Sequence, residues 1–435
     1  MGDLSFTAKE ESATVAAIYA WHKAKGDAEP QRGYLGASII GHDCDRYLWY
    51  TFRSCVKRDF SGRIYRLFQT GNLAESRFVA ELEGIGCEVV SHDEAGKQIE
   101  VLGIGGHFSG HLDGMAQGVP EAPKAWHVCE FKTHNDKSFG ALQKAGVQKS
   151  KPLHYAQMMV YMGLTKVDRA LYLAMNKDTD EIYSERVRYD AQAFKAIMSR
   201  AERIIASIQP PERCAGRSDD FRCKMCDARE LCWHCRTVAV PLPAMGCRTC
   251  CHATPEMDGG ARWSCSRHSK PDPRAGALWA WIEGTPSCPD HLLIPGLVGF
   301  ASVCDAGADW IEFQNDDDGA HWRHGTGEND TWSTEELMRT PCPMVKAKVT
   351  DLPLFMAYCD NLPLPDHYPP GDTELVWHGP LAGLEKAIRD NVRDAVEGEQ
   401  KHEDTDKTES WEFAGKFLAV IYKADNVAAL WKGKE

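Results

Sequence analysis

The order of the predicted helices and strands indicates a mixed α/β fold. Apolar residues recur at helical spacing over residues 8–25 and 62–83, and period-two strand patterns broken by Gly, Asp and Pro replace them between residues 86 and 132. Helical and strand patterns then alternate until two prolines end the last helix at 210–211. A chain with this order of elements predicts a mixed sheet flanked by helices.

The elements of this front half can be assigned in chain order. A second helix begins near Ser38 and carries HDCDRYLWYTF. The strand-like segments between residues 86 and 132 are short and closely spaced, so we expect them to form a short meander. The remaining elements are helices at 135–146 and 152–164, strands at 168–175 and 181–189, and a helix at 190–209.

The back half has a different composition. Residues 296–345 are rich in Trp, Gly and Asp and suggest a small β unit, and 346–370 contains many prolines. Helices are expected near 382–396 and 411–432, with the charged segment EGEQKHEDTDKTES between them as a loop. The predicted domains are 1–238, a cysteine-rich β module at 239–345, and an acidic, partly helical region at 346–435.

Composition restricts the class of protein. The chain has 435 residues, of which 43% are hydrophobic, so it is long enough for several globular domains. Its N-terminus has neither the basic start nor the apolar core of a secretion signal, and no apolar run is long enough to span a membrane, which predicts a cytoplasmic protein. Seventeen cysteines in a reducing compartment point to bound metal rather than to disulfides.

The net charge of −13 is unevenly distributed. Residues 1–240 sum to about +1, so the acidity belongs to the rest of the chain. The overall charge therefore does not exclude a nucleic-acid substrate for the front half, whereas the acidic back half is not expected to follow a phosphate backbone.

Two short segments, GHLDG at 110–114 and CEFKT at 129–133, carry the strongest chemical signal. In a strand, Glu130 and Lys132 point to the same face because side chains alternate, and Asp113 on a paired strand would meet them. Two carboxylates and a lysine at one point suit the hydrolysis of a phosphodiester by Mg²⁺ or Mn²⁺, with Lys132 orienting the attacking water. A surface hairpin with a Glu–Lys pair is the alternative.

Four segments occur in the order and at the distances typical of the RecB-type PD-(D/E)XK nucleases: GNLAE at 71–75, GHLDG, CEFKT, and HYAQMMVYM at 154–162. The chain resembles this family over roughly residues 36–236. The resemblance implies a restriction-endonuclease-like core, with Asp113, Glu130 and Lys132 as the catalytic set and Glu75 as an auxiliary acid. It also implies that Gln157 and Tyr161, which share a helix face, contact the active site or the DNA backbone.

Three cysteines follow the last helix of this region in a C-x2-C-x5-C pattern, and one lies far upstream in SIIGHDCDRYLWY. This arrangement resembles the iron–sulfur nucleases of CRISPR adaptation and of helicase–nuclease repair complexes, which implies a [4Fe-4S] cluster. Zinc on the same four thiolates is the alternative, and Cys214 and Cys235 are spare cysteines that can replace a ligand. The first cysteine group comprises Cys44, Cys223, Cys226 and Cys232.

A second cysteine group begins with a C-x2-C knuckle in MGCRTCCHATPEMDGG. Such a knuckle with two further thiolates is typical of a zinc ribbon. His291 is the nearest replacement ligand, Cys251, His252 and His268 are further alternates, and free thiols in a small core are the alternative. The second cysteine group comprises Cys247, Cys250, Cys265 and Cys288.

Together these features predict a Mg²⁺- or Mn²⁺-dependent deoxyribonuclease, with exonuclease activity in DNA recombination, repair or phage replication as the resemblance implies. A noncatalytic nucleic-acid or protein-binding module on the same scaffold is the alternative, and redox sensing is a third interpretation. DNA is the expected partner, with a recombinase, a single-strand-binding protein or a helicase beside it. The chain has no G-x4-G-K-[ST] motif, so any unwinding motor would be another chain.

Overall fold

The computed structural model describes residues 12–57, 59–233, 242–267, 288–316, 319–326 and 331–339, and the backbone of five strands between 373 and 433. The chain divides into two compact units. The first unit consists of Met1–Cys232 and Pro243–Cys288, and the second of Trp233–Leu242 and Pro289–Glu435. The domain boundaries near 238 and 345 stay predictions.

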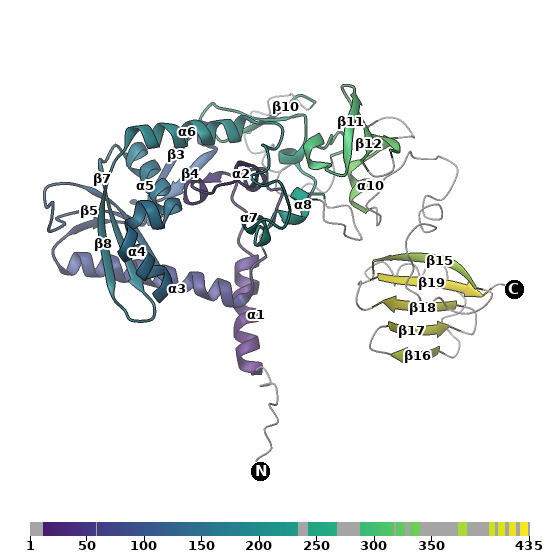
Figure 1. Ribbon diagram of the computed structural model, residues 1–435, viewed down its shortest axis with the longest axis horizontal. Coiled ribbons are helices and arrows are strands. Elements are labelled where there is room, and N and C mark those ends of the chain that lie inside the picture. Colours follow the sequence, from purple (N-terminus) through teal and green to yellow (C-terminus); the bar gives the residue numbers. More distant parts are fainter. Residues whose placement is uncertain are drawn as a thin grey trace, which may run out of the picture. The chain divides into compact units, whose positions relative to one another are not determined.

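The first unit has the predicted mixture of helices and strands (Figure 1). Its helices are α1 Ala13–Asp27, α2 Asp45–Phe52, α3 Gly62–Gly84, α4 Asp136–Ser150, α5 Pro152–Thr165, α6 Ala191–Ala206, α7 Phe221–Lys224 and α8 Arg229–Trp233. Its strands are β1 Leu35–Gly36, β2 Glu88–Val90, β3 Glu100–Gly103, β4 Phe108–His111, β5 Gly114–Gln117, β6 His127–His134, β7 Arg169–Asn176, β8 Ile182–Arg188, β9 Ala253–Pro255 and β10 Trp263–Cys265. The helix expected near Ser38 begins only at Asp45, after a short 3-10 turn at Ala37–Ile39.

The main sheet has five strands in the order β2-β5-β6-β7-β8, with β6 and β7 parallel and the other neighbours antiparallel. The expectation of one short meander was wrong, because β3 and β4 pair with β1 in a separate sheet. The left-handed residues Gly105 (φ 63°) and Gly106 (φ 87°) turn the chain tightly between β3 and β4, so these strands form their own hairpin.

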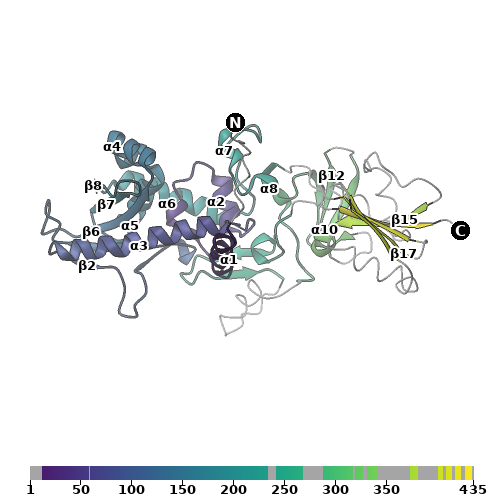
Figure 2. The ribbon, with the colours of Figure 1, turned by 90° about the horizontal axis from the view of Figure 1, so that it is seen from below.

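Helices cover both faces of the main sheet (Figures 1 and 2). On one face, Phe78 and Leu82 of α3 pack against Phe131 of β6 and Leu171 of β7. Helices α4 and α5 lie against the other face. Because the side chains of β6 alternate, Phe131 faces α3, and Glu130 and Lys132 face α5.

Hydrogen bonds join the N-terminal α2 to α6 and to the segment after it. Arg200 donates to Asp45 over 2.7 Å, Arg46 donates to the carbonyl of Pro211 over 3.0 Å, and the indole of Trp49 donates to the carbonyl of Ser207 over 2.9 Å. The two chain segments that carry the first cysteine group are therefore held together by these polar contacts.

Among its described residues, the second unit contains two sheets. The first has the order β11-β12-β13-β14 and confirms the predicted small β unit. Its strands are β11 Ala301–Ala306, β12 Trp310–Asn315, β13 His321–Gly325 and β14 Thr331–Trp332, followed by helix α10 Thr334–Arg339.

The second sheet is antiparallel, with the order β15-β19-β18-β17-β16. Its strands are β15 Thr373–Pro380, β16 Gln400–Asp404, β17 Thr408–Phe413, β18 Phe417–Tyr422 and β19 Val427–Gly433. The predicted helix at 411–432 was therefore wrong, and so was the loop across 397–410, because FLAVIY and TESWEF are rich in the β-branched and aromatic residues that strands favour. The helix expected at 382–396 and the proline-rich segment 346–370 lie outside the described residues.

None of the helices in the described part of the chain is long and apolar enough to cross a membrane.

Candidate active site

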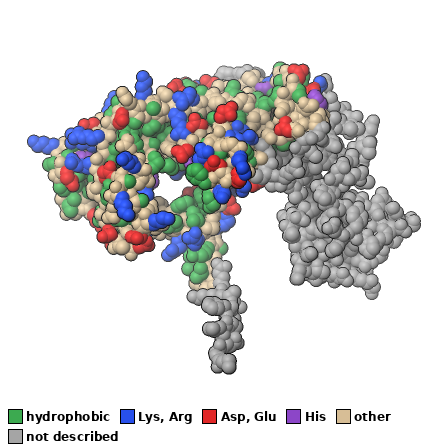
Figure 3. All heavy atoms as spheres, in the orientation of Figure 1, with side chains coloured by type: hydrophobic (Ala, Val, Ile, Leu, Met, Phe, Trp, Pro, Cys, Tyr) green, Lys and Arg blue, Asp and Glu red, His purple; other side chains and the backbone are tan. Residues whose placement is uncertain are grey.

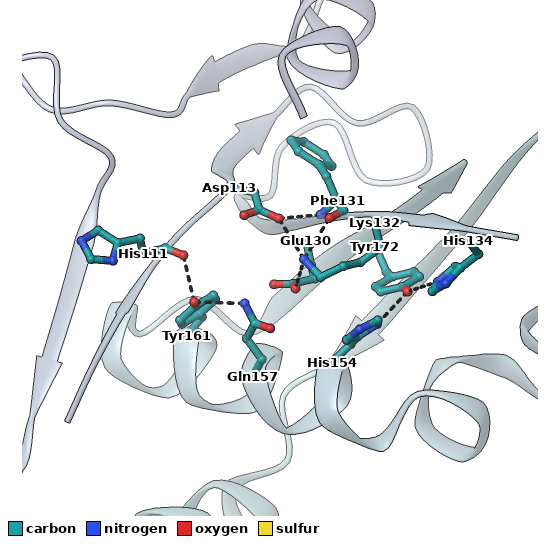
Figure 4. A network of polar contacts seen from close by, with 10 residues as sticks. All are labelled: His111, Asp113, Glu130, Phe131, Lys132, His134, His154, Gln157, Tyr161 and Tyr172. Carbon is teal, nitrogen blue, oxygen red and sulfur yellow. Dashed lines mark hydrogen bonds and ion pairs between the residues drawn. The ribbon is translucent and has the colours of Figure 1, made fainter. Parts of the chain in front are cut away.

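Strand β6 places Glu130 and Lys132 next to each other. The Lys132 ammonium lies 2.5 Å from Oε1 of Glu130 and 3.4 Å from Oδ2 of Asp113 (Figure 4). Glu130 is fully buried, whereas Lys132 is 24% exposed. The residues predicted from GHLDG and CEFKT thus meet at one point, and we call Asp113, Glu130 and Lys132 the acid–lysine cluster.

Asp113 lies in the bend between β4 and β5 rather than within a strand. Its Oδ2 accepts a 2.7 Å hydrogen bond from the backbone N–H of Phe131, which fixes the carboxylate beside β6. The ring of His111 points away from the acid–lysine cluster (Figure 4). Its Nδ1 lies 3.5 Å from the hydroxyl of Tyr34.

The acids of this site influence one another. Burial, assisted by repulsion from Asp113, raises the pKa of Glu130 to about 8, and the nearby Lys132 only partly offsets this. Burial and the charge of Asp113 likewise raise the pKa of Glu75 to about 7. Burial lowers the pKa of Lys132, but attraction to Asp113 and Glu130 outweighs burial and raises it overall. Glu75 of α3 is therefore close enough to Asp113 for the two carboxyl groups to interact.

A cleft of about 690 Å³ opens above this site. Glu75 and Asp113 line it, together with Gln157 and Tyr161 of α5. The sequence did not single out several of its other lining residues, most of which come from segments without a recognisable motif: Arg32, Tyr34, Ser91, His92 and Gln98.

Gln157 and Tyr161 are both buried and bonded inside the protein. The amide of Gln157 donates to the Tyr161 hydroxyl over 3.1 Å, and this hydroxyl donates to the carbonyl of His111 over 2.8 Å. A Cβ at Gly110 would lie 2.5 Å from the Tyr161 ring, so only glycine allows the ring to approach β4 so closely. The two residues brace β4 against α5 and also line the cleft with Asp113.

A second polar group lies beside Lys132 on the same face of the sheet. The Tyr172 hydroxyl is 3.0 Å from Nε2 of His134 and 2.9 Å from Nδ1 of His154 (Figure 4). No sequence motif indicated this group. The available signal was spacing, because His154 precedes Gln157 by three residues and Tyr161 by seven on one helix face.

The carboxylates fit a hard divalent cation. Both oxygens of Glu130 are buried, and apart from the ion pair with Lys132 they accept no hydrogen bond from the described residues. Within the described residues, no three His, Cys, Asp or Glu side chains form a complete metal-binding group. Mg²⁺ commonly binds through only one or two carboxylates and keeps several waters. The carboxylates of Asp113 and Glu130 are therefore suitable ligands for this ion.

The first cysteine group comes from distant parts of the chain. Cys44 directly precedes α2, whereas Cys223 lies in α7 and Cys232 in α8. Burial raises the pKa of Cys226, and the charges of Cys44, Cys232 and Cys223 add to this effect. The spare Cys214 hydrogen-bonds to Cys44, and Cys235 lies outside the described residues.

The second cysteine group is also gathered in space. Burial and then the charges of Cys250, Cys265 and Cys288 raise the pKa of Cys247 to about 11. The alternate His291 is buried, and its Nδ1 lies 2.8 Å from the Thr334 hydroxyl, while His268 lies outside the described residues. Both groups have the thiol chemistry that soft metals bind, and neither forms a complete metal-binding group among the described residues.

No family model and no curated protein matches the chain. Solved structures match it distantly. SSO0001 is 13% identical with a TM-score of 0.32, and the match covers 50% of this chain and 96% of SSO0001. LHK-Exo in complex with dAMP is 15% identical with a TM-score of 0.30, covering 44% of this chain and 91% of LHK-Exo. The alkaline exonuclease LHK-Exo from Laribacter hongkongensis also matches at 14% identity with a TM-score of 0.29, covering 43% and 91%. The likeness is a distant one of fold over about half of the chain.

Proposed function

We propose that the first unit is a Mg²⁺- or Mn²⁺-dependent DNA nuclease that uses the acid–lysine cluster. The observation that carries this proposal is the buried Glu130 beside Lys132 and Asp113: apart from the ion pair with Lys132, its oxygens accept no hydrogen bond from the described residues. A purely structural ion pair would be expected to satisfy the remaining oxygen sites of such a buried carboxylate. A cation-binding role explains why these sites stay open.

In this proposal Asp113 and Glu130 hold the divalent ion. When bound, the ion polarises a phosphate oxygen and lowers the pKa of the attacking water. Lys132 positions that water and offsets the negative charge that develops on the phosphate. The Phe131 N–H fixes the carboxylate of Asp113, so its orientation is set before substrate binds.

Glu75 acts as the auxiliary acid from α3. Its pKa of about 7 lets it exchange a proton near neutral pH, which suits a group that assists the attacking water or the leaving oxygen. The cleft above it accommodates the DNA strand, and Arg32 supplies a positive charge on its wall. Basic and acidic side chains are interspersed over the face of the first unit seen in Figure 3, so the charge within the cleft matters more for strand placement than a broad basic surface.

We assign exonuclease activity, and a role in recombination, repair or phage replication, from the family resemblance in GNLAE, GHLDG, CEFKT and HYAQMMVYM. On the same ground the first cysteine group holds a [4Fe-4S] cluster that joins the two ends of the nuclease domain. The C-x2-C knuckle and its two partners hold zinc. A recombinase, a single-strand-binding protein or a helicase is the expected protein partner.

Cleavage of end-labelled duplex and single-stranded DNA with Mg²⁺, Mn²⁺ or EDTA tests the proposal. We expect metal-dependent release of nucleotides that is lost in Lys132→Ala and kept in Lys137→Ala, a control at an exposed lysine of α4. DNA binding without cleavage under every metal condition would instead identify a noncatalytic binding module.

A further inference from the structure

One arginine connects the second cysteine group to the cleft above the acid–lysine cluster. Nη2 of Arg248 donates to the carbonyl of Gly33 over 2.7 Å, although the two residues are 215 positions apart in the sequence. Gly33 stands between Arg32 and Tyr34, which both line the cleft, and we call these three residues the cleft wall. Arg248 stands inside the C-x2-C knuckle of the second cysteine group. The knuckle therefore holds the backbone of the cleft wall.

Several contacts fix the guanidinium of Arg248. The residue is 4% exposed, and its Nη1 donates to the carbonyl of Phe52 at the end of α2 over 2.8 Å. The guanidinium carbon lies 5.0 Å from the centre of the Trp263 ring. The buried Arg53 donates in return to the carbonyl of Arg248 over 3.2 Å. Because a guanidinium presents its donors in a rigid plane, Arg248 sets the spacing between its two acceptors.

The loop between β9 and β10 contacts the β3–β4 hairpin on another side of the cleft. The backbone N–H of Ala261 donates to the carbonyl of Gly105 over 2.8 Å. Nε2 of the buried His107 lies 2.9 Å from the carbonyl of Glu256. His107 directly precedes β4, and residues 109–111 of β4 line the cleft. The segment that carries the second cysteine group thus supports two sides of the cleft.

Both supporting segments lie beside cysteines of the second cysteine group. The knuckle carries Arg248, and β10 ends at Cys265, two residues beyond Trp263. When zinc is bound, its tetrahedral site joins the knuckle to the end of β10, so Arg248 and Trp263 are held in register. Metal binding to such a module is coupled to its folding, and loss of the metal loosens both segments.

We propose that Arg248 is a positioning residue through which the second cysteine group, with its metal bound, sets the cleft wall and so controls the binding of the DNA strand. The inference rests on the proposed function for its effect on DNA, because Arg32 is there the positive charge that meets the strand. The position of the cleft wall is a property of the fold and can be measured without DNA.

Hydrogen exchange followed by mass spectrometry measures the cleft wall directly. The backbone N–H of Leu35 donates to the carbonyl of His107 over 2.8 Å, so it exchanges only when this region opens. The single ammonium of Arg248→Lys cannot span both carbonyls. We expect exchange of the peptide that contains Leu35 to become at least about tenfold faster, the factor for one lost hydrogen bond from a charged donor.

Two more variants separate this effect from general loosening. Cys265→Ser should lose zinc and give the same faster exchange at Leu35, with peptides of β7 unchanged. Arg262→Lys is the matched control, because Arg262 belongs to the same segment but is 55% exposed and pairs with Asp258. It should exchange as the wild-type protein does.

DNA binding shows whether the cleft wall acts through Arg32. Arg32→Ala removes one positive charge, so the slope of log Kd against log salt concentration should fall by about one. Arg248→Lys keeps its own charge but displaces the cleft wall, so it should lose the same slope, and the double variant should lose no more than either alone. Binding is measured in the Lys132→Ala background so that the DNA is not cleaved.

Wild-type exchange at Leu35 in Arg248→Lys or in zinc-free Cys265→Ser would overturn the inference. Additive losses of salt slope in the double variant, or a wild-type protein whose second cysteine group holds no metal, would also overturn it. If Arg248→Lys does not fold, removal of zinc from the wild-type protein by a chelator, with the same exchange measurement, decides the matter. If the wild-type protein neither binds nor cleaves DNA but the exchange pattern holds, the proposed function fails and the positioning role of Arg248 stands.

Discussion

The acid–lysine cluster and the first cysteine group are assembled in different ways. Asp113 and Lys132 are 19 residues apart in the sequence. The short hairpin between them brings the Lys132 ammonium to 3.4 Å from Oδ2 of Asp113. Cys44 and Cys232 are far apart in the sequence, and polar contacts of α2 with α6 and with the segment after it bring their surroundings together. The first site depends on local register, and the second depends on the closure of the whole unit.

Loss of catalysis without loss of folding should be the largest effect. Lys132→Ala and Asp113→Ala each remove a group at the reacting centre, so we expect kcat to fall at least ~10³-fold while the melting temperature changes little. Initial rates on labelled DNA and thermal unfolding measure the two quantities. Cleavage at wild-type rates in either variant would show that the acid–lysine cluster is not the catalytic site.

Substitution in the first cysteine group should have the opposite effect, lowering stability rather than catalysis. Cys226→Ser should remove the metal, lower the melting temperature by at least ~5 °C and reduce activity only through loss of folded protein. Iron and zinc content, absorption near ~400 nm and thermal unfolding check this, with the exposed Cys304→Ser of the second unit as the control. Stoichiometric zinc and no iron would overturn the iron–sulfur assignment, and full stability of Cys226→Ser would remove the structural role.

The same difference explains what the sequence could predict. Glu130 and Lys132 lie two residues apart on one strand, so the sequence alone predicts that their side chains share a face. The bend at Asp113 changes only the contacts around that residue. The Tyr172 contacts required the parallel register of β6 and β7, which no local pattern specifies. In the second unit, FLAVIY and VAALW are short enough to form either a helix or a strand. Their pairing with each other, and that of VAALW with the distant β15, decided the outcome.

Metal binding at the acid–lysine cluster should depend on pH. Because the pKa of Glu130 is raised to about 8, the metal-free protein keeps this proton at neutral pH, and a divalent ion must displace it. We expect the affinity for Mn²⁺ to rise between pH 6 and pH 8 by up to about tenfold per pH unit, measured by calorimetry. An affinity that does not change over this range would contradict the prediction.

The raised pKa of Glu130 also predicts how the stability of the metal-free protein depends on pH. The metal-free fold binds this proton more tightly than the unfolded chain does, so the contribution of Glu130 to stability is present below its ordinary pKa and is lost as the pH rises through about 8. Glu130→Gln should therefore raise the melting temperature of the metal-free protein at pH 8 by at least ~2 °C, although it abolishes cleavage. A matched scan at pH 5 should show a smaller difference.

The smallest effect is expected at Tyr161, which connects α5 to β4 without touching the acid–lysine cluster through any hydrogen bond. Tyr161→Phe removes both the bond accepted from Gln157 and the bond donated to the His111 carbonyl, at a cost of about 1–2 kcal/mol in the free energy of unfolding. Because the ring still fills the space that Gly110 leaves, the backbone that leads to Asp113 should keep its position, and kcat should fall no more than about threefold. Chemical denaturation and initial rates measure the two effects. A loss of activity as large as that of Asp113→Ala would instead mean that the Tyr161 hydroxyl acts on the substrate, as the family resemblance implied, and that the catalytic site extends from the strand register onto the face of α5.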